Sequence, residues 1–117
     1  MPYIDTDEVK AKRQEIRKAL KGWKVSVSRR HHSEIAVAIM SGPFDLSMGR
    51  GHIQVNQYHM DTHYEDHPEV LAVLRQAYQI ASRSQRELVY DSDYGSVPTF
   101  YVSLDIGKWD RPFEVRA

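Results

Sequence analysis

The order of its amphipathic segments is the sequence feature that most restricts the fold of this chain. A basic helical segment comes first, three segments with strand-like alternation follow, and a second, more apolar helical segment comes next. The three strand candidates before the second helix are Trp23–Arg29, Glu34–Met40 and His52–Met60. Two further candidates, after that helix, are Glu87–Tyr90 and Thr99–Ile106. This order predicts a single α+β domain over residues 1–117, in the order α-β-β-β-α-β-β. We expect a mainly antiparallel sheet of four or five strands with both helices on one face.

Capping residues mark where the two helices begin. Asp5 is a good N-cap and has Glu8 three residues later, which is the capping-box spacing, so the first helix is expected over Asp7–Leu20. Asp66 is a good cap for the second helix, and Pro68 suits the first helical position. Both helices therefore have defined starts.

Alternation within the strands assigns one face of the sheet to the core, because successive strand side chains point to opposite faces. The expected core residues are Trp23, Val25, Val27, Ile35, Val37, Ile39, Ile53, Val55, Phe100, Val102, Leu104 and Ile106. The opposite face carries Ala36, Ala38, Asn56 and Tyr58, which predicts a docking face for a partner or a second copy of the chain. The C-terminal segment, with Trp109 and Phe113, is expected to lie across the domain.

Composition excludes several classes of protein. The absence of cysteine excludes disulfides, zinc ribbons and thiol nucleophiles. The N-terminal sequence is acidic where a secretory signal would be basic and then apolar. No apolar run approaches the ~18 residues that a membrane span needs. We therefore expect a cytoplasmic protein with no membrane partner.

The net charge of zero conceals an uneven distribution. Residues 1–32 carry nine Lys/Arg and four Asp/Glu, while residues 33–117 carry seven and twelve. Such a split predicts either a mixed, solvated surface or a basic patch for an anionic partner. The candidate binding residues are Lys10, Arg13, Arg17, Arg29, Arg30, His31 and His32, together with Tyr58 on the expected docking face. Phosphates and acidic protein surfaces both suit such a cluster.

Histidine spacing raises a metal-dependent alternative. His59, His63 and His67 follow one another at four-residue intervals, and two histidines four apart on a helix can hold zinc. The expected elements instead place them on a strand end, a loop and a helix cap, so exposed loop histidines are the competing interpretation. A metal-dependent enzyme using His59 and His63 stays open as an alternative. No catalytic residue, metal ligand or cofactor is assigned.

The α-β-β-β-α layout is similar to that of double-stranded-RNA-binding domains, which read A-form RNA through shape and phosphates. In those domains a lysine-rich start of the second helix contacts phosphate. The corresponding residues here are Asp66-His67-Pro68-Glu69, which carry the wrong charge. This departure argues against an RNA duplex as the ligand.

A second resemblance spans most of the chain. The opening Tyr3-Ile-Asp-Thr-Asp-Glu-Val, then Lys24-Val-Ser-Val, Ser41-Gly42-Pro43, Val55-Asn56-Gln57-Tyr58 and the block Glu87–Arg111, with Tyr94-Gly95 and Phe100-Tyr101-Val102, resembles the large polyvalent protein-associated domain 29. The resemblance implies a stand-alone accessory protein of phages or mobile elements. It implies no established activity and no catalytic residues.

These observations lead to three hypotheses of function. The leading one is a non-enzymatic binding module of phage or mobile-element type that acts through a macromolecular partner, with a protein favoured and a second copy of the chain also considered. The second is a nucleic-acid-binding protein that uses the basic first helix and the Arg29-Arg30-His31-His32 hairpin. The third is the metal-dependent enzyme.

Overall fold

The computed structural model describes residues 3–85, 87–89 and 96–116. Its helices are α1 (Thr6–Ala19), α2 (Met60–His63) and α3 (Pro68–Ser82), and its strands are β1 (Lys24–Arg30), β2 (Glu34–Gly42), β3 (Ile53–Val55), β4 (Glu87–Val89), β5 (Ser96–Pro98), β6 (Tyr101–Ile106) and β7 (Glu114–Val115). The expected α+β class is confirmed. Tyr90, Tyr94 and Gly95, which belong to the strand and resemblance predictions, lie outside the described residues.

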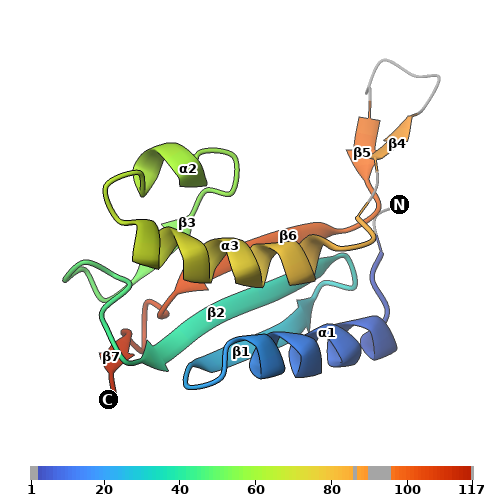
Figure 1. Cartoon of the computed structure of the whole chain (residues 1–117). Coiled ribbons are helices and arrows are strands. Elements are labelled where there is room, and N and C mark those ends of the chain that lie inside the picture. Colours follow the sequence, from blue (N-terminus) through green and yellow to red (C-terminus); the bar gives the residue numbers. More distant parts are fainter. Residues whose placement is uncertain (1–2, 86, 90–95, 117) are drawn as a thin grey trace.

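The main sheet has five strands in the order β1-β2-β6-β3, with β7 beside the end of β2. The β1–β2 and β3–β6 pairs are antiparallel, whereas β2 is parallel to both β6 and β7, so the sheet is mixed. The parallel pair arises because the chain passes through the helices before it returns as β6 beside β2. β4 and β5 pair only with each other, in a separate two-stranded sheet (Figure 1).

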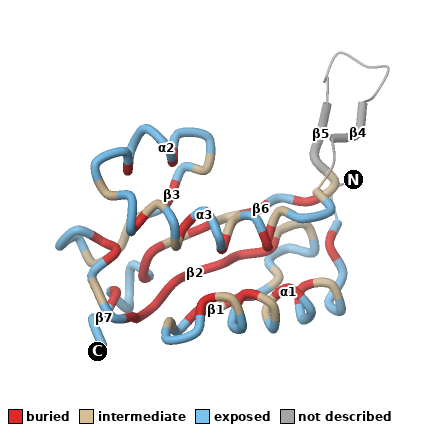
Figure 2. The backbone as a smooth tube through the Cα atoms, in the orientation of Figure 1, coloured by how far each residue is buried: buried red, intermediate tan, exposed pale blue. Residues whose placement is uncertain are grey.

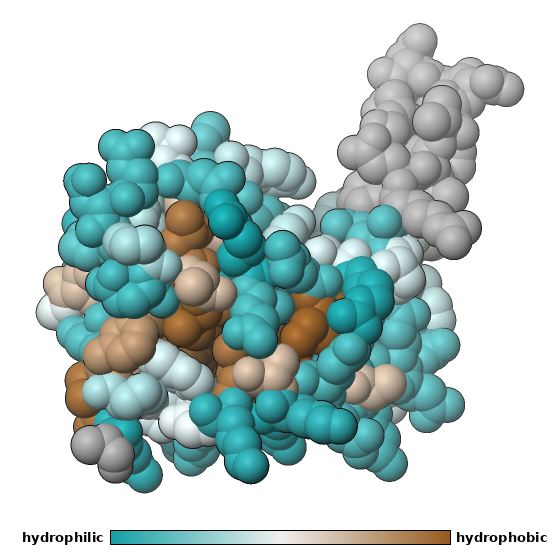
Figure 3. All heavy atoms as spheres, viewed as in Figure 1, coloured by the Kyte–Doolittle hydropathy of each residue, from teal (hydrophilic) through white to brown (hydrophobic). Residues whose placement is uncertain are grey.

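Both long helices pack on one face of the main sheet, as the sequence predicts (Figure 1). α1 lies over β1, α3 lies over β2 and β6, and the two helices also contact each other. The strand residues that face them are buried, and β2 is buried along almost its whole length (Figure 2). Seen from the helix side, hydrophilic residues surround a smaller hydrophobic area near α3 (Figure 3).

The start of α1 confirms the predicted cap. The Asp5 carboxylate accepts a hydrogen bond from the backbone N–H of Glu8 at 2.7 Å. α3 also begins at the predicted proline, but the prediction that Asp66 caps it is wrong. His67 occupies the N-cap position and makes no side-chain capping bond. Since the cap is the residue directly before the first helical one, Pro68 at that position leaves Asp66 one residue too early.

The third strand is shorter than predicted. β3 ends at Val55, and the chain then turns into α2, a single helical turn that the alternation did not indicate. Asn56 and Tyr58 therefore lie in the short connection between β3 and α2, and not on the sheet, where the sequence analysis expected them. The Asn56 side chain accepts the Tyr58 N–H at 2.9 Å, which fixes the turn. No helix among the described residues is both long and apolar enough to cross a membrane.

Candidate functional site: the uncovered face of the sheet

The face of the main sheet opposite α1 and α3, called the open face below, has no described helix packed on it. The register aligns Ser28, Ala36 and Ser103 in one row across the sheet, and Ser26, Ala38, Asp105 and Gln54 in the next. These rows form the floor of a groove of about 430 Å³. Because the central side chains are small, a ligand can approach the sheet closely there. Ala36 and Ala38 thus confirm the predicted second face of the sheet.

A tight turn after β6 forms one rim of this groove. Lys108 and Arg111 exchange backbone hydrogen bonds of 2.8 and 3.1 Å, and Trp109 and Asp110 lie between them. The Trp109 side chain is 86% exposed although it is the largest apolar group on the rim. An indole held at the tip of a turn offers a flat surface for stacking or apolar contact. Phe113, in contrast, is buried, so the tail packs onto the domain only in part as predicted.

The groove also contains a histidine–aspartate pair. His52 Nε2 lies 3.3 Å from Asp105 Oδ2, and both side chains are about one-third exposed. Such pairs orient general bases in hydrolases when the histidine also contacts a nucleophile. Within the described part of the chain, neither side chain bonds to a hydroxyl group. Among the described residues the pair therefore provides polar contacts on the groove wall.

Four cations line a hollow at the edge of β1, beside one end of the open face, and form what we call the basic corner. They are Arg17 from α1, Lys24 at the start of β1, and Lys108 and Arg111 from the turn after β6. They surround Met40 in a hollow of about 570 Å³, which adjoins the groove through Ser26 and Lys108. Among residues 3–85, 87–89 and 96–116, no carboxylate forms an ion pair with any of the four.

One acid near the basic corner, Glu114, is bonded to a neighbouring arginine. Glu114 accepts hydrogen bonds from Arg116 Nε at 3.2 Å and from Arg116 Nη2 at 2.8 Å. These bonds and the Arg116 charge, followed by the charges of Lys24 and Arg111, hold the pKa of Glu114 below its ordinary value. The carboxylate is therefore shared among several cations, and the corner retains a positive excess.

A network of backbone bonds fixes the turn that carries Lys108, Trp109 and Arg111. Gly107 N–H donates to the Ile39 carbonyl at 2.8 Å, and Phe113 N–H donates to the Gly51 carbonyl at 2.7 Å. Gly107 has φ +69°, and a Cβ there would lie 2.2 Å from the Gly51 oxygen. Only glycine allows this approach, so the turn is held between the end of β2 and the loop that precedes β3.

That loop is ordered in turn by Asp45. Its carboxylate accepts hydrogen bonds from the Ser47 N–H at 2.8 Å, the Ser47 hydroxyl at 2.5 Å and the Gly49 N–H at 2.9 Å. These bonds, led by the one from the Ser47 hydroxyl, lower the pKa of Asp45 below its ordinary value. The buried Ser47 Oγ then accepts the Gly51 N–H at 3.0 Å. Asp45 thus orders Ser47 and, through it, Gly51, whose carbonyl holds the turn at the rim of the groove.

The predicted cationic face of α1 is only partly available to a ligand. Lys10 and Arg17 are exposed, as expected. Arg13 is half-buried, because its Nε donates to the Val27 carbonyl of edge strand β1 at 2.9 Å. A cation placed on a strand edge satisfies a free carbonyl and discourages another strand from pairing there. Arg13 therefore has a structural role that the helical pattern does not reveal.

The predicted Arg29–His32 cluster is divided between the two faces of the sheet. Arg29 lies on the helix side, where its guanidinium contacts the Ile4 carbonyl at 3.4 Å and His32 Nδ1 at 2.9 Å. Arg30 lies on the open face and forms an ion pair with Glu34 at 3.2 Å. Adjacent strand residues point in opposite directions, so the two arginines do not form one surface.

His31 and His32 form the tip of the β1–β2 hairpin with unusual backbone angles. Their φ values are +56° and +63°, and the Ser33 N–H donates to the Arg30 carbonyl at 3.2 Å. Two consecutive residues with positive φ define a type I′ turn, which normally uses asparagine and glycine. The His32 carbonyl also accepts the Ile4 N–H at 2.9 Å, which ties the tip to the N-terminal segment. Tyr58 lies apart from this tip and is 84% exposed.

The three histidines of the metal hypothesis occupy separate structural positions. His59 occupies the N-cap position of α2, His63 is the last residue of α2, and His67 occupies the N-cap position of α3. The rings of His59 and His63 lie 5.9 Å apart between centroids. The described part of the chain contains no group of three His, Asp or Glu side chains placed to hold a metal ion.

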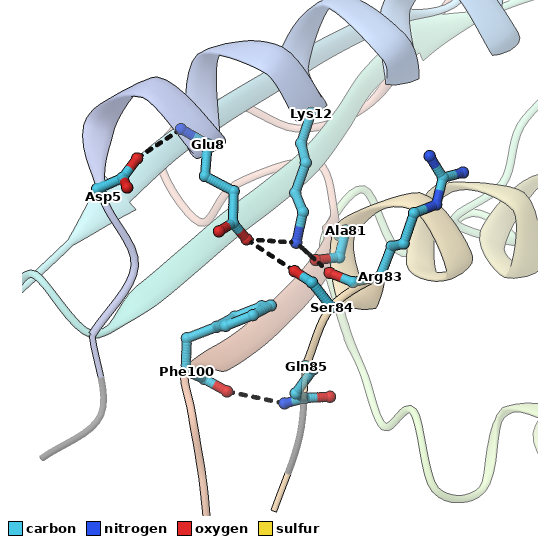
Figure 4. Close-up of polar contacts among 8 residues, drawn as sticks. All are labelled: Asp5, Glu8, Lys12, Ala81, Arg83, Ser84, Gln85 and Phe100. Carbon is cyan, nitrogen blue, oxygen red and sulfur yellow. Dashed lines mark hydrogen bonds and ion pairs between the residues drawn. The ribbon is translucent and has the colours of Figure 1, made fainter.

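A buried lysine, which the sequence analysis did not identify, joins α1 to the end of α3 (Figure 4). Lys12 Nζ donates to the Ala81 carbonyl at 2.7 Å and the Arg83 carbonyl at 2.6 Å, and it pairs with Glu8 at 3.0 Å. It also lies 4.2 Å from the centre of the Phe100 ring. Burial lowers the pKa of Lys12, although the Glu8 contact opposes this shift. All three ammonium protons have partners, so Lys12 acts as a structural link.

Comparisons with protein-family models, curated proteins and solved structures give no match for this chain.

Proposed function

We propose that the protein is a small, non-enzymatic binding module that receives a macromolecular partner on the open face. The observation that carries this proposal is the uncovered groove with the exposed Trp109 at its rim. Such a large apolar side chain at the edge of a sheltered, small-residue floor is typical of a contact surface. The ordered loop beneath the rim supports a preformed site, because it restricts the turn before any ligand binds.

The phage or mobile-element accessory role belongs to the same proposal, as does a cytoplasmic location. Tyr3, Ile4 and Gly42, from segments that carry the resemblance to the large polyvalent protein-associated domain 29, have structural roles in this fold. Tyr3 N–H donates to the Thr99 carbonyl at 2.7 Å, and Ile4 is buried. Gly42 lies against the Trp23 ring so closely that a Cβ would overlap it. Lys108 and Trp109, from the same resemblance, lie instead on the rim of the groove.

Site-specific photocrosslinking in host cells tests this proposal. A photoactivatable side chain replaces Ser28, which is exposed on the open face, and a matched variant carries it at Ala72, which is exposed on α3. We expect a discrete adduct from position 28 and none from position 72. The proposal is wrong if position 28 gives no adduct, or if both positions give the same adducts. An adduct with twice the mass of the chain identifies a second copy as the partner.

A further inference from the structure

The chemistry of the open face restricts the class of partner, on the basis of the binding function proposed above. A second, smaller hollow of about 180 Å³ lies next to the basic corner and shares Lys24 and Arg111 with it. The groove, the basic corner and this hollow are together lined by six basic and three acidic side chains. The basic residues are Arg17, Lys24, Arg30, Lys108, Arg111 and Arg116, and the acidic ones are Asp105, Asp110 and Glu114. Since the whole chain is neutral, this region concentrates positive charge.

Pairing within the region places that excess at one end. Asp105 faces His52, Glu114 is bonded to Arg116, and Arg30 pairs with Glu34. Asp110, in the turn between Lys108 and Arg111, forms no ion pair with a described residue, so its charge offsets one of the four cations of the basic corner. The four cations of the basic corner have no such partners within the described ranges. Cations held together without counter-charges favour a ligand that supplies several negative charges.

The neighbouring groove favours flat, uncharged groups. Its floor consists of small serine and alanine side chains with Asp105 and Gln54 at one side, and the Trp109 indole stands beside it. At the far end of the same face, Tyr101 aligns with Glu34 across the sheet and is 45% exposed. Aromatic side chains next to a cationic track are the features by which proteins hold unpaired bases without sequence preference.

We propose that the open face binds single-stranded nucleic acid, with phosphates at the basic corner and bases along the groove beside Trp109. A single strand satisfies both features, because its phosphates and its unstacked bases are accessible together. In a duplex the bases are stacked inside, so Trp109 has no base face to contact. This site differs from the α1 and hairpin surface indicated by the sequence, and it uses only Arg17 and Arg30 from that prediction.

Fluorescence anisotropy with a labelled oligodeoxythymidylate of about 15 nucleotides tests the proposal. We compare the wild type with Lys24→Ala/Lys108→Ala and with the matched control Lys10→Ala/Lys18→Ala, which removes two exposed cations from α1. At about 50 mM salt we expect the first variant to lose at least ~10-fold in affinity and the control to lose less than ~2-fold. Between about 50 and 200 mM salt, the log–log slope should fall by ~1.4 in the first variant only, since each lost single-strand phosphate contact contributes ~0.7.

Trp109 separates base contact from simple charge attraction. Trp109→Ala should weaken oligonucleotide binding by ~5- to 100-fold, whereas Trp109→Phe should retain most of it. A duplex of the same length should bind more weakly than the single strand, and its affinity should not depend on Trp109. The proposal is overturned if the wild type does not bind the oligonucleotide at low salt, or if both double variants lose affinity equally. It is also overturned if Trp109→Ala binds as tightly as the wild type.

The photocrosslinking experiment distinguishes failure of this inference from failure of the proposed function. If the adduct from position 28 keeps its mass after nuclease treatment and yields peptides of a second polypeptide by mass spectrometry, and the oligonucleotide does not bind, the partner is a protein. The open face is then still the binding site. If position 28 forms no adduct and the oligonucleotide does not bind, both proposals are wrong.

Discussion

At the scale of single residues, Lys12 shows how one side chain can join elements that are distant in sequence. It lies in α1 but supplies hydrogen bonds to two carbonyls at the end of α3, and only 6% of its surface is exposed. Helix ends leave carbonyls without intrahelical donors, so an ammonium group placed there acts as a cap provided by another helix. The apolar stripe of α1 contains this position, since Val9, Lys12 and Ile16 are all buried.

We therefore expect Lys12→Met to destabilise the protein by about 2 kcal/mol, because methionine retains the packing of the stem but leaves two carbonyls unpaired. Urea unfolding measures this as a lower midpoint at unchanged slope. Lys10→Met is the matched control, since Lys10 is exposed on the same helix, and it should change stability by less than ~0.5 kcal/mol. Equal midpoints for the two variants would show that the Lys12 bonds contribute nothing net.

The hairpin tip contains a second informative residue. His31 has φ +56°, a conformation that costs a residue with a Cβ roughly 1 kcal/mol and that asparagine tolerates better. Since no side-chain bond holds His31 within the described chain, His31→Asn should raise the urea midpoint. The exposed control His63→Asn, within α2 and at negative φ, should not raise it. An unchanged midpoint in His31→Asn would mean that the turn is not strained.

At the scale of elements, the sequence correctly predicted the features that depend on neighbouring residues, such as the starts of α1 and α3. Asp5 and Pro68 mark the starts of α1 and α3 because capping and proline geometry act within one turn. β2 and its buried face were likewise recognised from alternation. The parallel pairing of β2 with β6 was not predictable, because it joins residues more than sixty positions apart and leaves no periodic trace in either strand.

The candidate site shows the same division. Its floor was anticipated from Ala36 and Ala38, which alternate with core residues in β2. The basic corner was not, because Lys24 and Lys108 are brought together only by the tertiary fold. The alternation of strand side chains could have predicted that Arg29 and Arg30 lie on opposite faces of the sheet, because they are neighbours in one strand. Their joint role in binding stays a prediction.

The loop between β2 and β3 should depend on pH through Asp45. The hydrogen bonds that lower its pKa favour the ionised carboxylate in the folded state, so Asp45 contributes stability above its unfolded pKa of 3.8. This contribution is lost as the pH falls through the lower, folded-state value. Asp45→Asn should therefore be less stable than the wild type near neutral pH, by about 1 kcal/mol for an exposed carboxylate. The difference should shrink below about pH 3.

The urea midpoints of the wild type and Asp45→Asn, each measured near neutral pH and below about pH 3, test this effect. Asp66→Asn is the control, because Asp66 is an exposed carboxylate whose side chain has no bond within the described residues. Its midpoint should follow that of the wild type at both pH values. A difference between wild type and Asp45→Asn that stays constant with pH would show that the loop does not depend on the carboxylate charge.

At the scale of the whole molecule, the decisive feature is that the two faces of one sheet have different environments. Ala77 of α3 is fully buried on the helix side, and Ala38 of β2 lies on the floor of the groove. Both are alanines with little exposed surface, yet only Ala38 has a groove above it. Comparing the stability of Ala77→Leu with that of Ala38→Leu therefore tests whether the open face is uncovered in the isolated protein.

We expect Ala77→Leu to cost about 1–3 kcal/mol, because added methylene groups in a packed interior force side chains and backbone to move. Ala38→Leu should change stability by less than ~0.5 kcal/mol, since the groove of about 430 Å³ can accept the larger side chain. The same variant should weaken partner binding by filling the floor. Equal losses of stability would mean that the face is packed in the folded protein. A wild-type midpoint that rises with protein concentration would mean that a second copy covers it, because association stabilises the folded state by mass action.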